Sequence, residues 1–523
     1  MAGADPRLVR DVVVYGGTSA GVIAAYAAKR YGKSVLLIEP GRHLGGMSSG
    51  GLGATDIGDK YAITGLALDF YRRVGKYYGR SEAWQFEPHV AEQVFNQYVD
   101  EAGVEVLFSY RLKSVAKQGT QIRTAILEYA GEGKRSADLM VAAREFIDAT
   151  YEGDLMVQAG ASYTVGREPN TQYQETLNGV QLMTGHQFPE GVDPYVIPRN
   201  PSSGLLPGIT GVAVAPVGAG DRKVQAYNFR MTLCQGENRL PMEKPENYDA
   251  QRYELLIRLM EKRPWKTLQD GFIISPLPNG KTDWNNAGGF STDDIGKSWN
   301  YPEADYGRRA AIWKEHETYQ KGLLHFVATD PRVPEPIRKE MASWGYCPDE
   351  FLDTSGWPHQ LYVREARRLV GEYVMTEHNA RGTVTVNDAI GMAAYGMDSH
   401  NVQRVVVDGM VKNEGNVEVQ VPHPYPISYR AITPKRGEVT NLLVPVALSA
   451  SHIAYGSIRM EPVFMVLGQS AAIAASLAID AGVPVQRVDV RALQKELQEN
   501  PLAAGPNADF IARASATSLD RRL

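Results

Sequence analysis

A glycine turn near the start of the chain has the spacing of a dinucleotide-binding motif. Gly16 and Gly21 match the outer glycines of G-x-G-x-x-G, and Thr18 replaces the middle one. Such a turn brings a helix N-terminus, here at Ser19, against a pyrophosphate. Glu39 follows eighteen residues after Gly21, where a carboxylate accepts hydrogen bonds from ribose hydroxyls and disfavours a 2′-phosphate. The spacing predicts an adenine dinucleotide site, and a plain turn before a helix is the alternative.

A second group of glycines follows Glu39. Residues 41–58 hold seven glycines in eighteen positions, too many for a helix or a strand. The backbone there must adopt unusual torsion angles or lie against a ligand, and we expect a ligand. The candidate contacts in this loop are Arg42, His43, Gly45, Gly46, Met47 and Gly50. G-x-S-x-G also occurs at 46–50, but inside the loop and not between a strand and a helix, so a hydrolase serine is not expected.

Together these motifs resemble the FAD-dependent oxidoreductases of the glutathione-reductase structural class. The run from His43 to Met47, HLGGM, is followed by a further Gly-Gly pair, and classical nicotinamide dehydrogenases have no such run. More specific matches follow along nearly the whole chain: FIDAT at 146–150, EGDL at 152–155, VQAYNFR at 224–230, PHQLYVREARR at 358–368, SIRMEP at 457–462 and LGQSAA at 467–472. The resemblance implies an α/β fold, with a Rossmann-like parallel sheet, that binds FAD.

The resemblance also implies a place for each cofactor contact. Gly16, Thr18, Ser19 and Gly21 would meet the pyrophosphate, and Glu39 the adenosine ribose. Gly45, Gly46 and Met47 would lie along the isoalloxazine, Val115 near the adenine, and Ala149 and Thr150 at a strand end beside the cofactor. Gly468, Gln469 and Ser470 would open a helix whose positive N-terminus stabilises the reduced flavin. No metal ligand set is expected.

His43 raises the question of covalent attachment. In the related succinate dehydrogenase and fumarate reductase flavoproteins, a histidine shortly before a Gly-Gly pair carries FAD covalently. His43 lies at a similar, though not identical, distance from Gly50. The alternative is a loop histidine that touches the flavin or a phosphate without a bond, and the sequence leaves both open.

Candidate substrate chemistry precedes the expected flavin-facing helix. Oxidation of a C–H bond by flavin needs a base for the hydroxyl or amine proton, and His452 suits that task near neutral pH. Arg459 could anchor a carboxylate or balance the reduced flavin, and Tyr429 lies upstream. The alternatives are a structural histidine and an arginine that pairs with Glu461.

Other polar groups in the middle of the chain are weaker candidates. His359 and Gln360 could reach the pocket, as could Asn228 and Arg230. One aromatic and polar group resembles the lining of a carbohydrate pocket, or else a turn-rich loop: Trp284, Asn285, Asn286, Asp293, Asp294, Trp299 and Tyr301. Three arginines at helical spacing, Arg364, Arg367 and Arg368, are read as structural ion pairs on a helix over 361–376.

Strands and helices of the expected types flank these motifs. Residues 11–15 and 34–39 read as strands around a helix at 22–31, and 139–149 as another strand. A helix at 87–103 precedes strands at 104–108, 112–115 and 122–129, expected as a small antiparallel insert. Helices are expected at 249–262 and 308–325, strands at 390–421 and 442–448, and a core helix at 463–481. We predict an FAD domain from residues 1–165 and 422–523, with an α+β substrate domain at 166–421.

Composition limits the partners. The net charge of −5 gives no reason to expect nucleic acid or an anionic membrane. Cys234 and Cys347 are too few and too far apart in sequence for a disulfide framework, a redox pair or a zinc site. Residues 1–10 contain no recognisable secretory signal, so a cytoplasmic location is expected. Whether a leader was removed stays open. A second G-x-G-x-x-G for NAD(P)H is missing.

The sequence therefore predicts an FAD-dependent oxidoreductase. Its substrate would be a small polar molecule, a sugar, polyol or hydroxy acid, that yields a hydride to flavin N5. The electron acceptor and the oligomeric state stay open. The alternatives are an FAD-containing isomerase or lyase without net redox change, and a flavin-binding protein without enzymatic activity.

Overall fold

The structure is a computed structural model that describes residues 7–133 and 137–505. Its largest sheet has the order β3-β2-β1-β6-β5-β4, with β19 beside β6. These strands are β1 Arg7–Tyr15, β2 Val35–Glu39, β3 Glu105–Phe108, β4 Tyr110–Gln118, β5 Gln121–Tyr129, β6 Leu139–Asp148 and β19 Leu442–Leu443. The four strands from β3 to β6 are parallel, as is β19, whereas β5 and β4 are antiparallel. The predicted α/β class with a Rossmann-like sheet is confirmed.

Both faces of this sheet are buried. Val12 and Val14 of β1 belong to one apolar cluster, and Val13 and Tyr15 to another on the opposite face. This follows from the alternation of side chains along a strand, and it explains why parallel strands read as unbroken apolar runs. The first face is covered by helices α1 Ser19–Arg30, α2 Gly65–Tyr77, α3 Pro88–Ala102 and α11 Glu461–Ala481.

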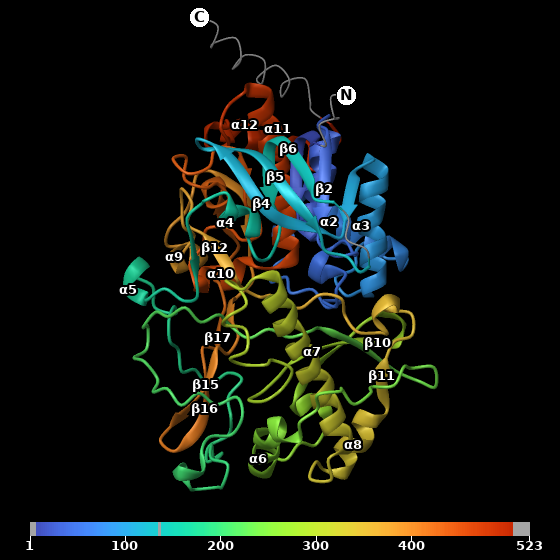
Figure 1. The fold of residues 1–523 in the computed structure, drawn as a ribbon, viewed down its shortest axis with the longest axis vertical. Helices are drawn as coiled ribbons and strands as arrows, with labels where there is room; N and C mark the ends of the chain where they lie inside the picture. The colour runs from blue at the N-terminus through green and yellow to red at the C-terminus, as the bar shows by residue number, and fades with distance from the viewer. Residues whose placement is uncertain (1–6, 134–136, 506–523) are drawn as a thin grey trace, which may run out of the picture.

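Helix α11 is the core of this region. It is long and apolar enough to cross a membrane, yet its residues from Glu461 to Ile479 are all buried in the protein. The prediction of a core helix is therefore confirmed. Because α11 packs along α1, the end of the chain completes the domain that its beginning starts, and Figure 1 shows the red and blue elements together.

The middle of the chain forms smaller antiparallel units (Figure 1). A four-stranded sheet has the order β11-β8-β10-β9, from β8 Met231–Gln235, β9 Phe272–Pro276, β10 Lys281–Asn286 and β11 Trp344–Tyr346. Two-stranded units pair β7 Tyr163–Val165 with β12 Arg367–Leu369, β13 Ala389–Ala393 with β18 Tyr425–Ser428, β14 Met397–Ser399 with β17 Val417–Val419, and β15 Gln403–Val407 with β16 Met410–Glu414.

The remaining helices are shorter, apart from α7. They are α4 Asp154–Gln158, α5 Asn170–Tyr173, α6 Glu254–Lys262, α7 Tyr306–Thr329, α8 Glu335–Ala342, α9 Glu377–Ala380, α10 His452–Ile458 and α12 Val490–Glu499. The helices expected at 249–262 and 308–325 are present as α6 and α7, and the one at 87–103 as α3. The division into two domains at 165/166 and 421/422 stays a prediction.

Three sequence predictions of elements are wrong. The segment 361–376 is not a helix, because its arginines point to different buried partners: Arg364 to Asp293 and Arg368 to Glu168. Strand β3 pairs in parallel with β2, so it belongs to the main sheet and not to an antiparallel insert. The strand expected over 442–448 is only two residues long, and the rest of that segment is buried in an irregular conformation.

Candidate functional site

The glycine turn is locked against the end of β6. Gly16 has φ +102°, and a Cβ there would lie 2.9 Å from the Ala149 carbonyl carbon. Thr18 caps α1 by accepting a hydrogen bond from the Gly21 amide, and its hydroxyl donates to the Ala149 carbonyl at 2.7 Å. At Gly21 a Cβ would overlap the Gly16 carbonyl. Only glycine allows these approaches, so the sequence spacing reflects backbone packing around the α1 N-terminus.

Glu39 closes the end of β2 beside this turn. Its carboxylate accepts hydrogen bonds from the Gly17 amide at 2.7 Å and the Gly41 amide at 2.5 Å. Burial outweighs these amides and raises the pKa of Glu39 to about 7. A carboxyl group held here is therefore close to half ionised at neutral pH.

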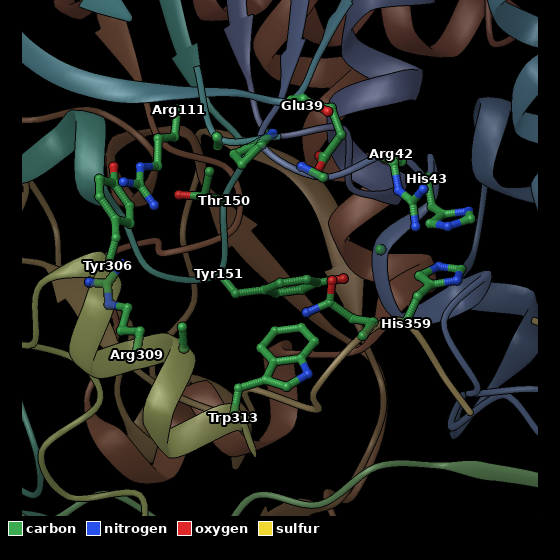
Figure 2. Close-up of a pocket in the computed structure, with 18 of the residues that line it drawn as sticks. Glu39, Arg42, His43, Arg111, Thr150, Tyr151, Tyr306, Arg309, Trp313 and His359 are labelled. Atoms are coloured by element: carbon green, nitrogen blue, oxygen red, sulfur yellow. The ribbon is translucent and has the colours of Figure 1, made fainter. Parts of the chain in front are cut away.

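A long cavity starts at Glu39 and runs past the glycine turn. Its volume is about 980 Å³, at the upper end of the range for ligand pockets. Seven of the predicted cofactor residues line it: Gly16, Thr18, Glu39, Arg42, His43, Gly46 and Thr150. Figure 2 shows Tyr151 and Trp313 next to each other, on the opposite side of the cavity from Glu39. Arg111, Tyr306 and Arg309 lie along another side.

The other predicted contacts near the turn lie behind this wall. Ser19, Gly21 and Ala149 are buried at the turn itself, and Gly45, Met47 and Gly50 are buried in the glycine loop. A Cβ at Gly45 would strike the Phe95 ring of α3, so part of the loop's glycine content serves packing against α3. Val115 does not line the cavity, whose wall near the sheet comes instead from Ser109, Arg111, and 129–132.

The prediction that Gly468, Gln469 and Ser470 open a helix is wrong. Helix α11 begins at Glu461, and Gly468 lies in its middle, where a Cβ would be 2.4 Å from the Ala20 carbonyl oxygen. Gln469 accepts a hydrogen bond from the Leu66 amide at the start of α2, and the Ser470 hydroxyl donates to backbone carbonyls. Gly468 and Gln469 thus join α11 to other helices, and Ser470 joins it to strand β13. An apolar run gives no sign of where a buried helix begins, which is why the start was misplaced.

The helix start instead brings Glu461 behind the cavity wall, against the lining residue Tyr151. Its carboxylate accepts hydrogen bonds from the hydroxyls of Ser19 at 2.5 Å, Tyr151 at 2.7 Å and Ser48 at 3.2 Å. The Tyr151 oxygen in turn accepts from the Met47 amide at 2.9 Å. Burial raises the pKa of Glu461. The sequence made Glu461 a candidate for substrate chemistry or a partner for Arg459, and not a group that holds the glycine turn. The acid-proline pair at 461–462, typical of a first helical turn, is the signal that could have placed it.

Comparison with known proteins decides the family. A family described as FAD dependent oxidoreductase matches residues 11–497, nearly the whole chain. This chain belongs to that family. The match bears out the predicted resemblance, the oxidoreductase activity and FAD as the cofactor.

Solved structures give a more distant likeness. A geranylgeranyl bacteriochlorophyll reductase-like protein from Thermoplasma acidophilum is 12% identical over 99% of this chain and 87% of its own, with a TM-score of 0.38. AlpK is 12% identical over 98% and 75%, with a TM-score of 0.34. THI4 from Thermovibrio ammonificans is 18% identical over 32% and 71%, with a TM-score of 0.24. No curated protein matches the chain. Identities and TM-scores this low say nothing about the substrate.

The cavity of this FAD-dependent oxidoreductase fits its cofactor. Gly16 leaves backbone open at the first turn of α1, whose N-terminal partial positive charge suits a pyrophosphate. Glu39 presents a half-buried carboxylate, and the volume suits a dinucleotide better than a single nucleotide. The role of each predicted contact stays a prediction.

The predicted catalytic group does not assemble in this oxidoreductase, and that grouping was wrong. The Nδ1 of His452 lies 2.7 Å from Glu365, and neither side chain lines the cavity. Tyr429 donates to the Val485 carbonyl, where it serves the core. Arg459 pairs with Asp398 at 2.7 Å, and not with Glu461. The three residues are buried in separate networks, because polar residues near a core helix need internal partners.

His43 and His359 form a stacked pair at the cavity. Their ring centroids are 3.9 Å apart at 8° between the planes, and Figure 2 shows one ring below the other. Glu92 and Asp353 take both ring nitrogens of His43, and these two carboxylates outweigh burial and raise its pKa. Both nitrogens of His359 are buried without a hydrogen bond, and burial beside His43 lowers its pKa to about 3. Covalent attachment at His43 stays a prediction, and it would require a nitrogen to leave a carboxylate.

Two further clusters contain groups that often do chemistry. Cys234 on β8 and Cys347, which directly follows β11, interact as free thiols although 113 residues separate them in sequence. Burial and Cys234 raise the pKa of Cys347, which makes it a poor nucleophile. Among the described residues, Glu87, His89 and Asp349 could surround a metal ion. The Lys281 ammonium already supplies a cation there, 2.7 Å from Glu87 and 2.8 Å from Asp349.

Proposed function

We propose that this protein oxidises a hydroxyl-bearing carbon of a small polar substrate, a sugar, polyol or hydroxy acid, with flavin N5 as the hydride acceptor. FAD, when bound, supplies the two-electron chemistry. The observation that carries the proposal is the cavity of about 980 Å³ in which Gly16, Glu39 and Gly46 share one wall. We propose that this wall binds the FAD of the family.

Different residues of this wall would bind different parts of FAD. Glu39 would accept hydrogen bonds from the adenosine ribose, and the first turn of α1 would face the pyrophosphate. Glu461 fixes the positions of Ser19 and Ser48, so it holds the glycine turn and the glycine loop in register. At the far end, Tyr151 and the ring of Trp313 limit access of water.

The electron acceptor remains to be identified. The missing second glycine fingerprint argues against a bound pyridine nucleotide as partner. We propose a small-molecule acceptor, and a cytoplasmic site of action without nucleic acid or membrane partners.

Anaerobic reduction tests this function. Purified holoprotein is mixed without oxygen with sugars, polyols and hydroxy acids, and the visible flavin band is followed. The proposal predicts bleaching by at least one class and formation of the matching carbonyl product. If substrate is consumed while its oxidation state is unchanged, the isomerase or lyase alternative replaces the proposal. If no compound bleaches the flavin, the proposed substrate class is wrong.

A further inference from the structure

A second cavity lies next to the first. Its volume is about 460 Å³. The glycine loop connects the two, because Gly46 lines the first cavity and Asp56 lines the second. The segment after Trp357 does the same, with Gln360 on the first and Tyr362 on the second. The same two chain segments therefore line both cavities, so a ligand in the second cavity lies beside the family's cofactor site.

Two glycines of the glycine loop allow it to lie in close contact with the other segments that line these cavities. A Cβ at Gly50 would lie 2.3 Å from Cβ of Gln360, and one at Gly51 would lie 2.1 Å from the Arg230 carbonyl oxygen. The glycine loop therefore contacts Gln360, which lines the first cavity, and Arg230, which lines the second. Side chains at Gly50 and Gly51 would force these segments apart.

The charges of the second cavity are already compensated. Arg230 holds Asp283 through two hydrogen bonds, and Asp398 is paired with Arg459. Further ionic contacts join His186 to Glu418 at 2.9 Å and Arg230 to Asp56 at 3.7 Å, and those of His400 are described below. Among the described side chains that line the cavity, carboxylates outnumber arginines. A substrate carboxylate would find no unpaired cation and a substrate ammonium no unpaired carboxylate, because Asp56, Asp398 and Glu418 are themselves paired, so a neutral ligand fits better.

Neutral polar groups complete the lining. Asn285, Asn286, Ser275, Tyr362 and Tyr395 line the cavity. Nη1 of Arg230, on a side chain that is 3% exposed, has no hydrogen-bond partner. Its charge is balanced by Asp283, so this donor suits a neutral oxygen. Hydroxyl groups both donate and accept, and a ligand with several of them satisfies such a mixed lining.

His400 has the arrangement of a base. Its Nδ1 lies 2.6 Å from Asp293, a buried carboxylate whose pKa is lowered by Arg364 and His400 against the effect of burial. An ionised carboxylate only accepts, so Nδ1 carries the hydrogen. Burial, and then Arg364, lower the pKa of His400, which keeps the ring neutral. Nε2 is therefore the bare nitrogen, and it lies 3.8 Å from Asp398.

The backbone at this cavity also departs from ordinary geometry. His186 has φ +46°, which is uncommon for a residue with a side chain. The side-chain amides of Asn401 and Asn413 donate hydrogen bonds to the His186 carbonyl and hold its backbone in this conformation. Its ring lies parallel to that of His400 at 6.4 Å between centroids. Strain of this kind collects where a side chain must be aimed at a ligand.

We propose that the second cavity is the substrate site and that it takes an uncharged polyhydroxylated compound, a sugar or a polyol, with His400 as the base. This inference rests on the proposed function and narrows its substrate class by excluding hydroxy acids. Nε2 of His400 accepts the proton of one hydroxyl group, and the hydrogen on the same carbon leaves with its electron pair to FAD. The carbon–oxygen bond becomes a carbonyl, FAD is reduced by two electrons, and Asp293 holds the imidazolium that forms.

Binding of matched compounds tests the substrate class. Oxidised holoprotein is titrated by calorimetry with aldoses and alditols, with the aldonic acid of each sugar, and with the corresponding amino sugars. Within such a set the hydroxyl pattern is nearly constant and the charge varies. We expect at least one neutral member to bind at least tenfold tighter than its acid and its amine. Equal or tighter binding of the acid or the amine overturns the inference.

Two variants test whether the ligand binds in the second cavity and whether His400 is the base. Tyr395→Phe should weaken binding of the neutral compound three- to tenfold. His400→Gln should change binding less than threefold but slow anaerobic flavin reduction at least a hundredfold. It should also remove the pH dependence of that rate, to which the groups facing His400 contribute: Asp293, Asp398, Arg364, His186 and Glu418. His325→Gln, on α7 away from both cavities, is the matched control and should change nothing.

The outcomes separate the two proposals. If neutral compounds bind and Tyr395→Phe weakens them, but none bleaches the flavin, the cavity assignment stands and the proposed oxidation fails. If compounds bleach the flavin while Tyr395→Phe and His400→Gln leave binding and rate unchanged, the oxidation stands and the second cavity is not its site. Thermal unfolding of each variant confirms that the fold is intact.

Discussion

The carboxylate of Glu461 accepts a 2.5 Å hydrogen bond from the hydroxyl of Ser19, across 442 residues of sequence. Ser19 is the first residue of α1, and Glu461 is the first residue of α11. The same carboxylate receives the Tyr151 hydroxyl at 2.7 Å. Three distant chain segments thus meet at one buried acid, and the start of α11 supports Tyr151, which lines the large cavity.

We expect Glu461→Gln to loosen this junction. The Gln amide accepts only through its one oxygen and presents two hydrogens in place of the second, so at least one of the buried contacts is lost. The loss of a partner for a buried polar group costs about 1–3 kcal/mol. Denaturant unfolding of the apoprotein should show that decrease, and FAD should bind at least tenfold more weakly. Ser48→Ala removes only the longest of the three hydrogen bonds and is the milder control. An unchanged FAD affinity in Glu461→Gln would contradict the positioning role.

Gly16→Ala should damage the site more than an equivalent change elsewhere. Gly16 and Gly32 both have positive φ, +102° and +75°, but a Cβ at Gly16 would press on the β6 end whereas one at Gly32 meets nothing within 4 Å. Alanine at Gly32 should cost about 1–2 kcal/mol through its backbone conformation alone. At Gly16 the steric overlap should add roughly 1–3 kcal/mol. Unfolding measurements on both variants, with FAD titration, separate the two effects: only Gly16→Ala should lose FAD.

The parts of the site that sequence predicted well are those defined by local spacing. The turn from Gly16 to Gly21 and the acid at Glu39 depend on a single strand-turn-helix-strand unit, and the structure has that unit. Buried strands and amphipathic helices such as α3 were recognised for the same reason. Their signals lie within one short window of the chain.

The parts that sequence missed depend on contacts between distant segments. Arg364 and Arg368 have helical spacing, yet their buried partners Asp293 and Glu168 hold the chain in an irregular path. His452 and His400 are equally plausible bases by residue type. Only the fold shows that Glu365 holds the first inside the core, whereas the second lines a cavity. Tertiary partners decided each of these cases, and no local pattern encodes them.

The affinity for FAD should depend on pH through Glu39. Burial raises the pKa of this carboxyl to about 7 in the ligand-free protein, and ribose hydroxyls need the ionised form as acceptor. Binding should therefore strengthen as the pH rises through 7, and about tenfold between pH 6 and pH 8. The stability of the apoprotein should change in the opposite direction, because the folded state holds this proton more tightly than the unfolded chain. It should fall as the pH rises from about 4.5 to 7.

Glu39→Gln is the matched control for that titration. The amide keeps the size of the side chain but does not ionise in this range. We expect weaker FAD binding at pH 8 and a nearly flat affinity between pH 6 and pH 8, measured by quenching of flavin fluorescence. A variant that keeps the wild-type pH profile would show that another group controls binding.

His452→Leu separates the sequence prediction from the structure. A catalytic base at this position would make the variant lose flavin reduction by about two to four orders of magnitude. The structure instead places His452 in a buried network, 2.7 Å from Glu365, which also contacts Arg368 at 2.8 Å. Removing the imidazole should lower stability by about 1–3 kcal/mol, because Glu365 loses one of its partners. Tyr429→Phe, which loses only the bond to the Val485 carbonyl, should cost about 1 kcal/mol. Rapid-mixing reduction rates within threefold of wild type for both variants, alongside lowered unfolding midpoints, would assign both side chains to the core; a hundredfold slower His452→Leu would restore it as the base and displace His400.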